Sequence, residues 1–208
     1  MCKIIVMANQ KGGVAKTSST RNLAYSLAEL GKKVLAVDFD PQTNLTISFG
    51  VAPAALQETA ASLMMKLVMD EALPEKESCI LNIGKVDLLP SKKTLTVAEV
   101  NLLIERKDDC LAKLLAPLRA DYDYILVDTG PSLGSLTINA FTAADEIIIP
   151  VDPELFALVG LKELTETISK IKQNLNPKVE IIGILFTKCS KRTTLYRQTS
   201  EQVRSVFG

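Results

Sequence analysis

The sequence predicts an α/β fold, a mostly parallel central sheet with helices on both faces. Short apolar runs rich in β-branched residues alternate with segments whose apolar residues recur every three or four positions. An alternation of this kind builds βαβ units, which align strands in parallel and pack helices against the sheet. The 208 residues contain no internal repeat, low-complexity tract or linker, so residues 1–208 are expected to form one domain.

The strands are predicted from the apolar runs, which are short and end in polar or turn-forming residues. In chain order they cover residues 4–8, 34–37, 80–83, 86–90, 124–128, 146–151 and 180–186. Gly84-Lys85 separates two of these runs and indicates a hairpin turn, so those two strands are expected to pair directly.

The helices are predicted from apolar spacings of three and four. Leu23, Leu27 and Leu30 mark the first helix, which the turn at Gly31 ends. Pro117 must stop or kink the helix in which it lies. The further helical segments run over residues 54–70, about 94–105, about 109–118, up to about 143, 158–171 and from about 193.

Composition excludes several classes of protein. The chain has 24 basic and 24 acidic residues, so it lacks the overall basic charge of many nucleic-acid-binding domains. It has no histidine, the commonest metal ligand and general base. Four scattered cysteines favour reduced thiols in a cytoplasmic protein over a disulfide or zinc framework. No apolar run approaches the roughly 18 residues of a membrane span, and Met1 leads straight into the first strand, so no signal peptide is expected.

The loop at residues 9–18 is the strongest candidate for a functional site. It follows the first strand, carries Gly12 and Gly13, and precedes the first helix. Glycines let backbone N–H groups approach an anion, and the helix N-terminus adds unpaired N–H groups and the positive end of a dipole. Lys16 can then reach the β- and γ-phosphates of a nucleotide, and the Thr17 hydroxyl can ligate Mg²⁺.

This loop departs from the usual phosphate-loop pattern of Gly, four residues and Gly-Lys-Ser/Thr. Gln10 and Ala15 hold the two glycine positions, and Lys11 is an additional lysine. If position 15 requires a positive φ, the Cβ of alanine costs roughly 1–2 kcal/mol. If φ is negative there, alanine costs little. The sequence alone leaves both conformations open.

Three aspartates are the candidates that complete this site. Asp128 ends a buried strand, as a Walker B carboxylate does, and would orient metal-bound water. Asp40 follows the strand at 34–37, is held extended by Pro41, and is the candidate for positioning the attacking water. Asp38 is a candidate for the surroundings of the metal or for holding the loop. The alternative for each is a structural role at the end of a strand.

Several motifs together resemble the ParA/MinD family of ATPases with a deviant Walker A loop, and most closely the ParA/Soj-type partition proteins. The loop at 11–17 resembles the family's Lys-Gly-Gly-x-Gly-Lys-Thr/Ser pattern, and 37–42 resembles its Asp-x-Asp-Pro-Gln motif. Residues 122–134 resemble its Walker B region, and 149–161 and 187–193 resemble two later blocks. The departures are Ala15, Gly130 for a proline, Asp152 for a glutamine and Ser190 for an aspartate.

The resemblance implies a P-loop NTPase-like fold, with ATP and Mg²⁺ as cofactors. It implies nucleotide contacts from Lys11, Gly12, Gly13, Val14, Ala15, Lys16, Thr17 and Ser18. It implies metal binding by Thr17, Asp38 and Asp128, and catalytic roles for Asp40, Lys11 and Lys16.

The resemblance also implies a working cycle. ATP drives a sandwich homodimer in which Lys11 reaches the partner's nucleotide. The dimer binds DNA without sequence preference, and a ParB-type partner stimulates slow hydrolysis and release. Such cycling segregates plasmids or chromosomes in a cytoplasmic, nucleoid-associated protein with no membrane contact.

The end of the sequence sets further expectations. Family members usually continue some tens of residues beyond Gly208, so the chain is expected to lack the family's C-terminal part, which places DNA binding in question. Residues 188–208 carry five basic side chains and one acidic one, which suits a phosphate-binding surface or a solvated face. The alternative functions are a nucleotide-dependent regulatory dimer with little hydrolysis and a MinD-like membrane-associated positioning ATPase.

Overall fold

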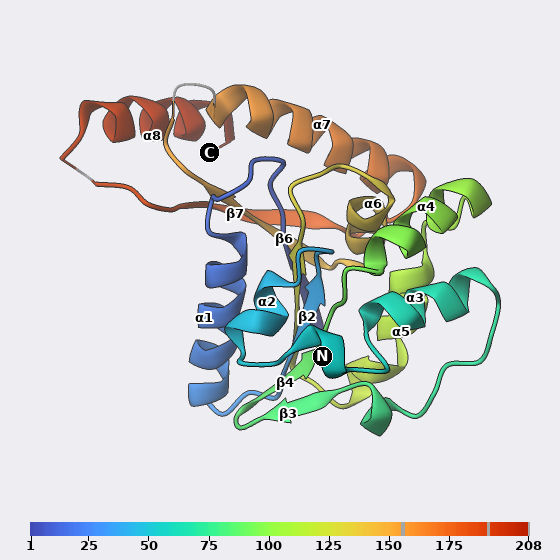
Figure 1. Cartoon of the computed structure of the whole chain (residues 1–208). Coiled ribbons are helices and arrows are strands. Elements are labelled where there is room, and N and C mark those ends of the chain that lie inside the picture. The colour runs from blue at the N-terminus through green and yellow to red at the C-terminus, as the bar shows by residue number, and fades with distance from the viewer. Residues whose placement is uncertain (155–156, 191, 208) are drawn as a thin grey trace.

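The structure, a computed structural model, describes residues 1–154, 157–190 and 192–207, with only the backbone described at positions 157 and 195. Within these residues one sheet has seven strands in the order β3-β4-β2-β5-β1-β6-β7 (Figure 1). Neighbouring strands are parallel except for the antiparallel hairpin of β3 and β4. The strands are Lys3–Met7 (β1), Val34–Phe39 (β2), Leu81–Ile83 (β3), Val86–Leu89 (β4), Tyr124–Thr129 (β5), Glu146–Val151 (β6) and Glu180–Phe186 (β7).

The predicted α/β fold class is confirmed, and each predicted strand is found. Gly84, with φ of 71°, makes the turn of the predicted hairpin. The α-helices are Lys16–Glu29 (α1), Asn44–Ser48 (α2), Ala60–Val68 (α3), Leu95–Glu105 (α4), Cys110–Leu115 (α5), Ser135–Ala143 (α6), Ala157–Asn174 (α7) and Thr194–Phe207 (α8).

Two helix predictions were wrong in part, and one helix was missed. The helix predicted over 54–70 begins only at Ala60, because Thr59 and Ser62 form a capping box there. The helix predicted over 109–118 ends at Leu115, and a short 3₁₀ turn begins at Pro117. The missed helix, α2, has five residues, too few to show a helical repeat.

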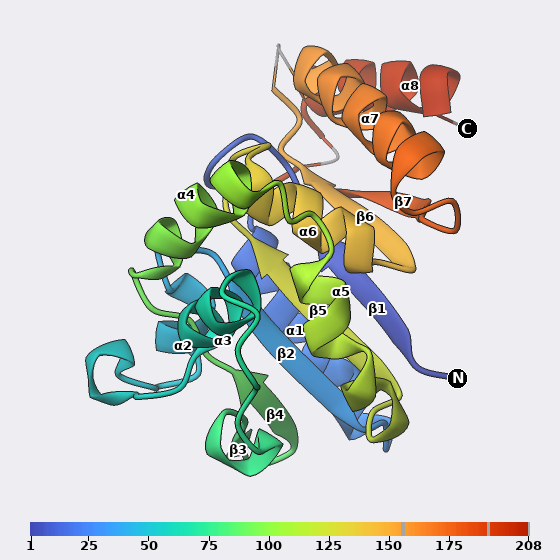
Figure 2. The ribbon, with the colours of Figure 1, turned by 90° about the vertical axis from the view of Figure 1, so that its right-hand side faces the viewer.

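The sheet is buried on both faces along its central strands β2, β5 and β1, whereas the edge strand β7 leaves Ile181, Ile182 and Leu185 more than a third exposed. Alternate residues of a strand point to opposite sides, so Ile4 and Val6 of β1 enter one core cluster and Ile5 enters the other. Helices α3 to α8 cover the first side, and α1 and α2 cover the second (Figures 1 and 2). Each fully buried Leu or Ile side chain contributes roughly 1.5–3 kcal/mol to stability, which makes the parallel strands a rigid base.

The parallel register brings the predicted site residues to one edge of the sheet. Met7, at the end of β1, lies beside Asp128 of β5, and Asp128 in turn lies beside Asp38 of β2. On the other side of β1 come β6 and then β7, whose ends pair Val151 with Phe186. The loops that follow these five strands therefore meet at the carboxyl edge, where α/β folds bind their ligands.

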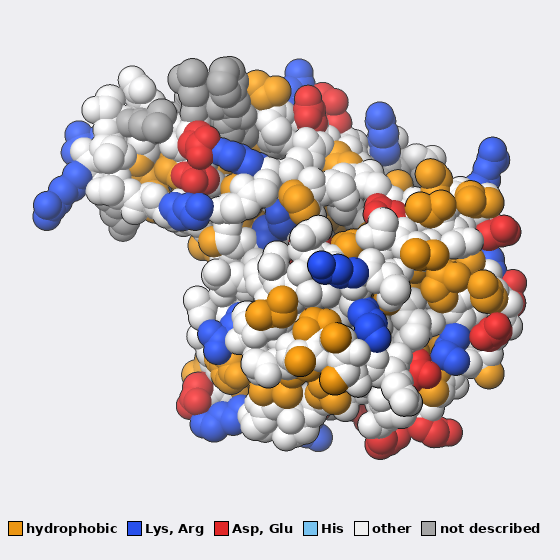
Figure 3. All heavy atoms as spheres, in the orientation of Figure 1, with side chains coloured by type: hydrophobic (Ala, Val, Ile, Leu, Met, Phe, Trp, Pro, Cys, Tyr) orange, Lys and Arg blue, Asp and Glu red, His pale blue; other side chains and the backbone are white. Residues whose placement is uncertain are grey.

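Apolar side chains also gather on the surface at α4 (Figure 3). They are Val97, Val100, Leu103 and Ile104, each more than half exposed. Among the described helices, none combines the length and the apolar character needed to cross a lipid bilayer.

Candidate functional site

The loop between β1 and α1 is held by a hydrogen bond within the loop and by hydrogen bonds to β6 and to the loop after β7. The side-chain amide of Asn9 donates to Pro150 O (2.7 Å), and its oxygen accepts from the backbone N–H of Lys11 (2.9 Å). The hydroxyl of Thr187, from the loop after β7, donates to Val14 O (3.0 Å). Gly12 and Gly13 are exposed and Val14 is buried, so the backbone of the loop faces outward on a fixed base.

Ala15 takes the costly one of the two conformations that the sequence left open. Its φ is 64° and its ψ is 29°, which is left-handed, and it is the N-cap of α1. Gly13 is also left-handed, with φ of 73°. The Cβ of Ala15 therefore costs roughly 1–2 kcal/mol where a glycine would cost nothing. With this backbone conformation, the free N–H groups of the first turn of α1 face the phosphate loop. They belong to Lys16, Thr17 and Ser18.

We expect Ala15→Gly to raise the free energy of unfolding by about 1 kcal/mol, because relief of left-handed strain exceeds the extra chain entropy of glycine. Ala28→Gly is the control in the right-handed last turn of α1, and it should lower the free energy of unfolding by up to about 1 kcal/mol. Urea unfolding of both variants measures the difference. Equal destabilisation by the two substitutions would contradict the assignment of strain to Ala15.

Lys16 is folded back onto the loop. Its Nζ donates to Asn9 O (2.9 Å) and Lys11 O (3.1 Å), and the residue is buried. Burial lowers the pKa of Lys16, while the charges of Asp128 and Asp40 act in the opposite direction. Both hydrogen-bond partners are neutral carbonyl groups, so the nearby charges of Asp128 and Asp40 act on Lys16 without a direct ion pair among the described residues. The loop thus holds an ammonium group in place for an anion.

Lys11 makes an ion pair with Glu154 in the same chain. Both side chains are about half exposed, at 46% and 54%. Lys11 lowers the pKa of Glu154 through the hydrogen bond and its charge, and Lys188 lowers it further. An exposed pair of this kind is screened by water and contributes little to stability, so little free energy is needed to release Lys11 for another anion.

Asp128 lies fully buried behind the loop. One carboxylate oxygen accepts from the Thr20 hydroxyl at 3.4 Å, and the other, Oδ2, has no hydrogen-bond partner. Burial is the largest of the effects that raise the pKa of Asp128 to about 7. The side chain of Thr17, half-buried in the first turn of α1, lies near the carboxyl group and acts in the opposite direction, lowering that pKa. A buried, unpartnered carboxylate oxygen beside a hydroxyl is the donor set that Mg²⁺ prefers, so these residues fit the expected ion.

Asp38 uses both of its oxygens inside the protein. One accepts from the N–H (2.7 Å) and hydroxyl (2.6 Å) of Thr46, and the other accepts from the N–H of Asp40 (3.3 Å). Burial, the largest effect, raises the pKa of Asp38 to about 6. This geometry favours a positioning role for Asp38, which clamps α2 and the Asp40 turn. Direct metal binding by Asp38 stays a prediction. Thr46 was missed because it lies in α2.

Asp40 is buried at the carboxyl edge of the sheet, just after β2. Its Oδ1 accepts from the N–H of Gln42 (2.9 Å). The same oxygen lies only 3.2 Å from the position that a Cβ on Gly130 would take. The structure thus brings Asp40 against the residue that replaces the family's proline, and the glycine leaves room for the carboxyl group.

The raised pKa of Asp128 predicts a pH-dependent stability. The folded protein holds this proton more tightly than the unfolded chain, whose pKa is near 3.8. The resulting stabilisation is present below pH 4 and is lost as the pH rises through about 7. At pH 8 we expect nucleotide-free Asp128→Asn to be more stable than the parent by about 2–4 kcal/mol.

Urea unfolding of Asp128→Asn at pH 5 and pH 8 tests this expectation. The exposed Asp109→Asn is the control and should change stability by less than about 0.5 kcal/mol at either pH. The expectation would be contradicted if the difference in unfolding free energy between the parent and Asp128→Asn were the same at pH 5 and at pH 8.

Known proteins are similar to this chain over nearly its whole length. A family model described as an AAA domain matches residues 2–181. An uncharacterized protein of Mycobacterium tuberculosis is 41% identical over 99% of this chain, which spans 64% of that relative's length. The chromosome partitioning protein ParA of Myxococcus xanthus is 41% identical, with 99% of this chain and 71% of the relative covered. The sporulation initiation inhibitor protein Soj of Bacillus subtilis is 38% identical, with 100% and 81% covered.

Solved structures also match this chain over nearly its whole length. Cobyrinic acid a,c-diamide synthase from Mycobacterium smegmatis, with bound ADP and magnesium, has a TM-score of 0.91 and 35% identity, with 100% of this chain and 83% of that chain covered. A plasmid partition protein from Borrelia burgdorferi has a TM-score of 0.81 and 30% identity, with 98% and 85% covered. By the family match, the identities and the site that these motifs build, the chain belongs to the ParA/MinD family of P-loop NTPases, among relatives named ParA and Soj.

Proposed function

We propose that this protein is a ParA-like partition ATPase that binds Mg-ATP, dimerises on it and hydrolyses it slowly. The observation that carries the proposal is that the phosphate loop and a buried carboxylate meet at the carboxyl edge of the sheet. The phosphate loop holds the ammonium of Lys16 on two neutral carbonyl groups, and Asp128, whose Oδ2 has no hydrogen-bond partner in the described structure, is buried close enough for its charge to act on Lys16. Relatives named ParA and Soj, and a similar structure with bound ADP and magnesium, support it.

Within one chain, the loop binds the phosphates. The N–H groups of residues 11–17 and the start of α1 surround the anion, and Lys16 exchanges its two carbonyl partners for phosphate oxygens. The Thr17 hydroxyl and Asp128 hold Mg²⁺ directly or through water. When bound, Mg²⁺ neutralises charge on the phosphates and orients the nucleotide.

Asp40 positions the attacking water. Phosphoryl transfer depends mainly on in-line positioning and on charge stabilisation. Asp38 supplies the positioning, because its oxygens fix both Thr46 and the N–H of Asp40. The carboxylate of Asp40 is thereby held at the carboxyl edge next to the loop without being a ligand of the phosphate itself.

Between two chains, Lys11 completes the site. It leaves Glu154, with which it pairs in the single chain, and reaches the phosphates of the partner's nucleotide. The exchange replaces a half-exposed ion pair with a contact to a more highly charged group in a drier interface, which favours the ATP-bound dimer.

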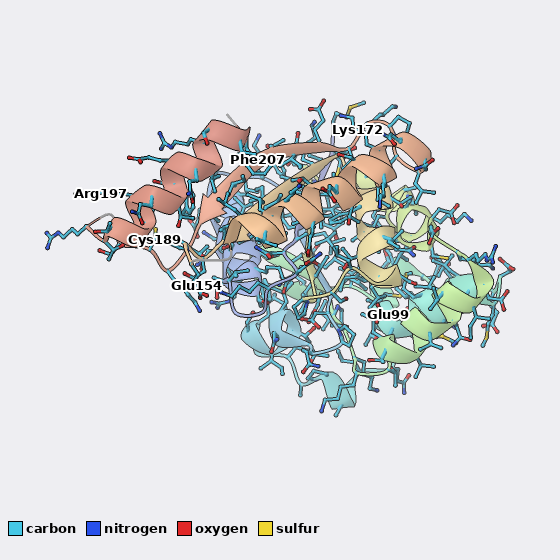
Figure 4. All side chains as sticks on the ribbon, turned by 90° about the horizontal axis from the view of Figure 1, so that it is seen from above. Glu99, Glu154, Lys172, Cys189, Arg197 and Phe207 are labelled. Atoms are coloured by element: carbon cyan, nitrogen blue, oxygen red, sulfur yellow. The ribbon has the colours of Figure 1, made fainter. Side chains whose placement is uncertain are left out.

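DNA binding and stimulation by a ParB-type partner follow from the family and are part of the proposal. Arg192, Arg197 and Arg204 are exposed at and along α8, and Figure 4 shows Arg197 pointing away from the molecule. These side chains suit contacts to DNA phosphates, which require no sequence preference. Lys191 of the same basic segment lies outside the described residues.

Light scattering with Mg-ATP, with Mg-ADP and without nucleotide tests this function. We expect the 22.6 kDa chain to double in mass only with Mg-ATP, and phosphate release to accompany the dimer. A dimer that releases no phosphate would favour the alternative of a regulatory dimer with little hydrolysis. A chain that neither binds nucleotide nor changes mass would overturn the proposal.

A further inference from the structure

The loop between β7 and α8 lies against the phosphate loop, although the two are more than 170 residues apart in sequence. The Thr187 hydroxyl donates to Val14 O at 3.0 Å. In the next residue, the Nζ of Lys188 lies 3.8 Å from the position that a Cβ on Gly13 would take. Because Gly13 has no side chain, no Cβ stands between the ammonium group of Lys188 and this part of the phosphate loop. Figure 4 labels Cys189, the following residue, and Glu154, which lies in the loop after β6.

The backbone of Lys188 is in a strained conformation. Its φ is 52°, a left-handed conformation that residues with a Cβ rarely adopt. Such a conformation persists where the surroundings determine it, and it is concentrated at functional sites. Here the hydrogen bond from Thr187 to Val14 fixes the loop immediately before Lys188.

The charges around the phosphate loop leave Lys188 available to an anion. Glu154 is the ion-pair partner of Lys11, and the effect of Lys188 on the pKa of Glu154 is smaller than that of Lys11. Lys11 and Lys16 belong to the β1–α1 segment itself, and Lys188 adds a third ammonium group near it from the loop after β7. A nucleotide polyphosphate carries enough negative charge to engage more than one of them.

We infer that Lys188 is a nucleotide-binding residue that contacts the phosphates bound in its own chain. The inference rests on the proposed function and adds a residue to it. Lys16 acts from within the loop and Lys11 acts toward the partner chain, whereas Lys188 acts from the loop after β7 across Gly13. Because this contact needs no partner chain, it strengthens the binding of Mg-ADP and Mg-ATP alike.

The test replaces Lys188 with asparagine. Asparagine tolerates the left-handed backbone, so Lys188→Asn removes the ammonium group without adding strain. Affinities for Mg-ADP and for a non-hydrolysable Mg-ATP analogue are measured by isothermal titration calorimetry. We expect about a tenfold loss for both nucleotides in Lys188→Asn, and a loss of less than about threefold in Lys188→Arg, which keeps the charge.

Lys178→Asn is the matched control, because Lys178 is exposed near the opposite end of β7. It should leave both affinities unchanged, and thermal unfolding without nucleotide should be the same for the parent and both asparagine variants within about 2 °C. Unchanged affinities in Lys188→Asn would overturn the inference and leave Lys188 as a neighbour of Glu154. A loss confined to the ATP analogue would also overturn it, because it would place Lys188 at the dimer. A parent chain that binds neither nucleotide would overturn the proposed function as well, so the two failures are distinguishable.

Discussion

Lys16→Ala is expected to lower the affinity for Mg-ADP by at least about 100-fold and to leave the chain monomeric in Mg-ATP. The ammonium group of Lys16 is buried, and within the described part of the chain it donates only to the carbonyl oxygens of Asn9 and Lys11, which phosphate oxygens can replace. Hydrogen bonds to charged groups contribute about 1.5–3 kcal/mol each, and two of them account for this loss. Calorimetric titration gives the affinity, and light scattering gives the mass.

Lys11→Ala is the matched control within the same loop. The ion pair with Glu154 holds the side chain of Lys11 away from the phosphate site of its own chain. The variant should therefore bind Mg-ADP within about threefold of the parent, yet fail to dimerise in Mg-ATP. If Lys16→Ala bound Mg-ADP as the parent does, the loop would not be a phosphate site, and equal losses in both variants would contradict their separate roles.

The strands and the phosphate loop could be predicted because their signals are local. Short apolar runs must be buried on both faces in a parallel sheet, and each run ends where a polar residue reaches the edge. The loop at residues 9–18 shows its chemistry in its own glycines and lysines. The three aspartates were placed correctly at the edge for the same reason, since each directly follows or ends an apolar run.

The conformation of Ala15 could not be predicted, because alanine occurs in both regions of φ and only the path of the chain decides between them. Nothing in the composition of the loop shows that position 15 must turn left-handed between β1 and α1. The role of Asp38 was open for a similar reason. Its partner Thr46 lies in α2, whose five residues give no periodic signal.

The contacts of Lys11 and Lys188 depend on strand order. Glu154 follows β6 and Lys188 follows β7, and both reach the phosphate loop only because the sheet runs β1-β6-β7 on that side. An alternation of strands and helices predicts parallel pairing but leaves several strand orders open. The lysine at position 188 therefore gave no signal of its own beyond its place in a basic segment.

Asp40→Asn is expected to slow phosphate release by about 100- to 1,000-fold at saturating Mg-ATP, which is the usual contribution of a group that positions or activates a nucleophile. Asparagine keeps the shape of the side chain and an oxygen that can accept from the N–H of Gln42. Binding and dimerisation should therefore persist, and the Mg-ATP dimer should have a longer lifetime than that of the parent. Phosphate release and light scattering on the same sample measure both quantities.

Gly130→Ala separates the position of Asp40 from its charge. The added Cβ would lie 3.2 Å from Oδ1 of Asp40, so the carboxylate must move by a few tenths of an ångström while it stays ionised. Positioning of water is sensitive to shifts of this size, and we expect turnover to fall several-fold, less than in Asp40→Asn. Turnover that survives Asp40→Asn would remove Asp40 from the chemistry. Turnover that falls in Asp40→Asn but is unaffected by Gly130→Ala would show that the charge of Asp40 matters and its placement against Gly130 does not.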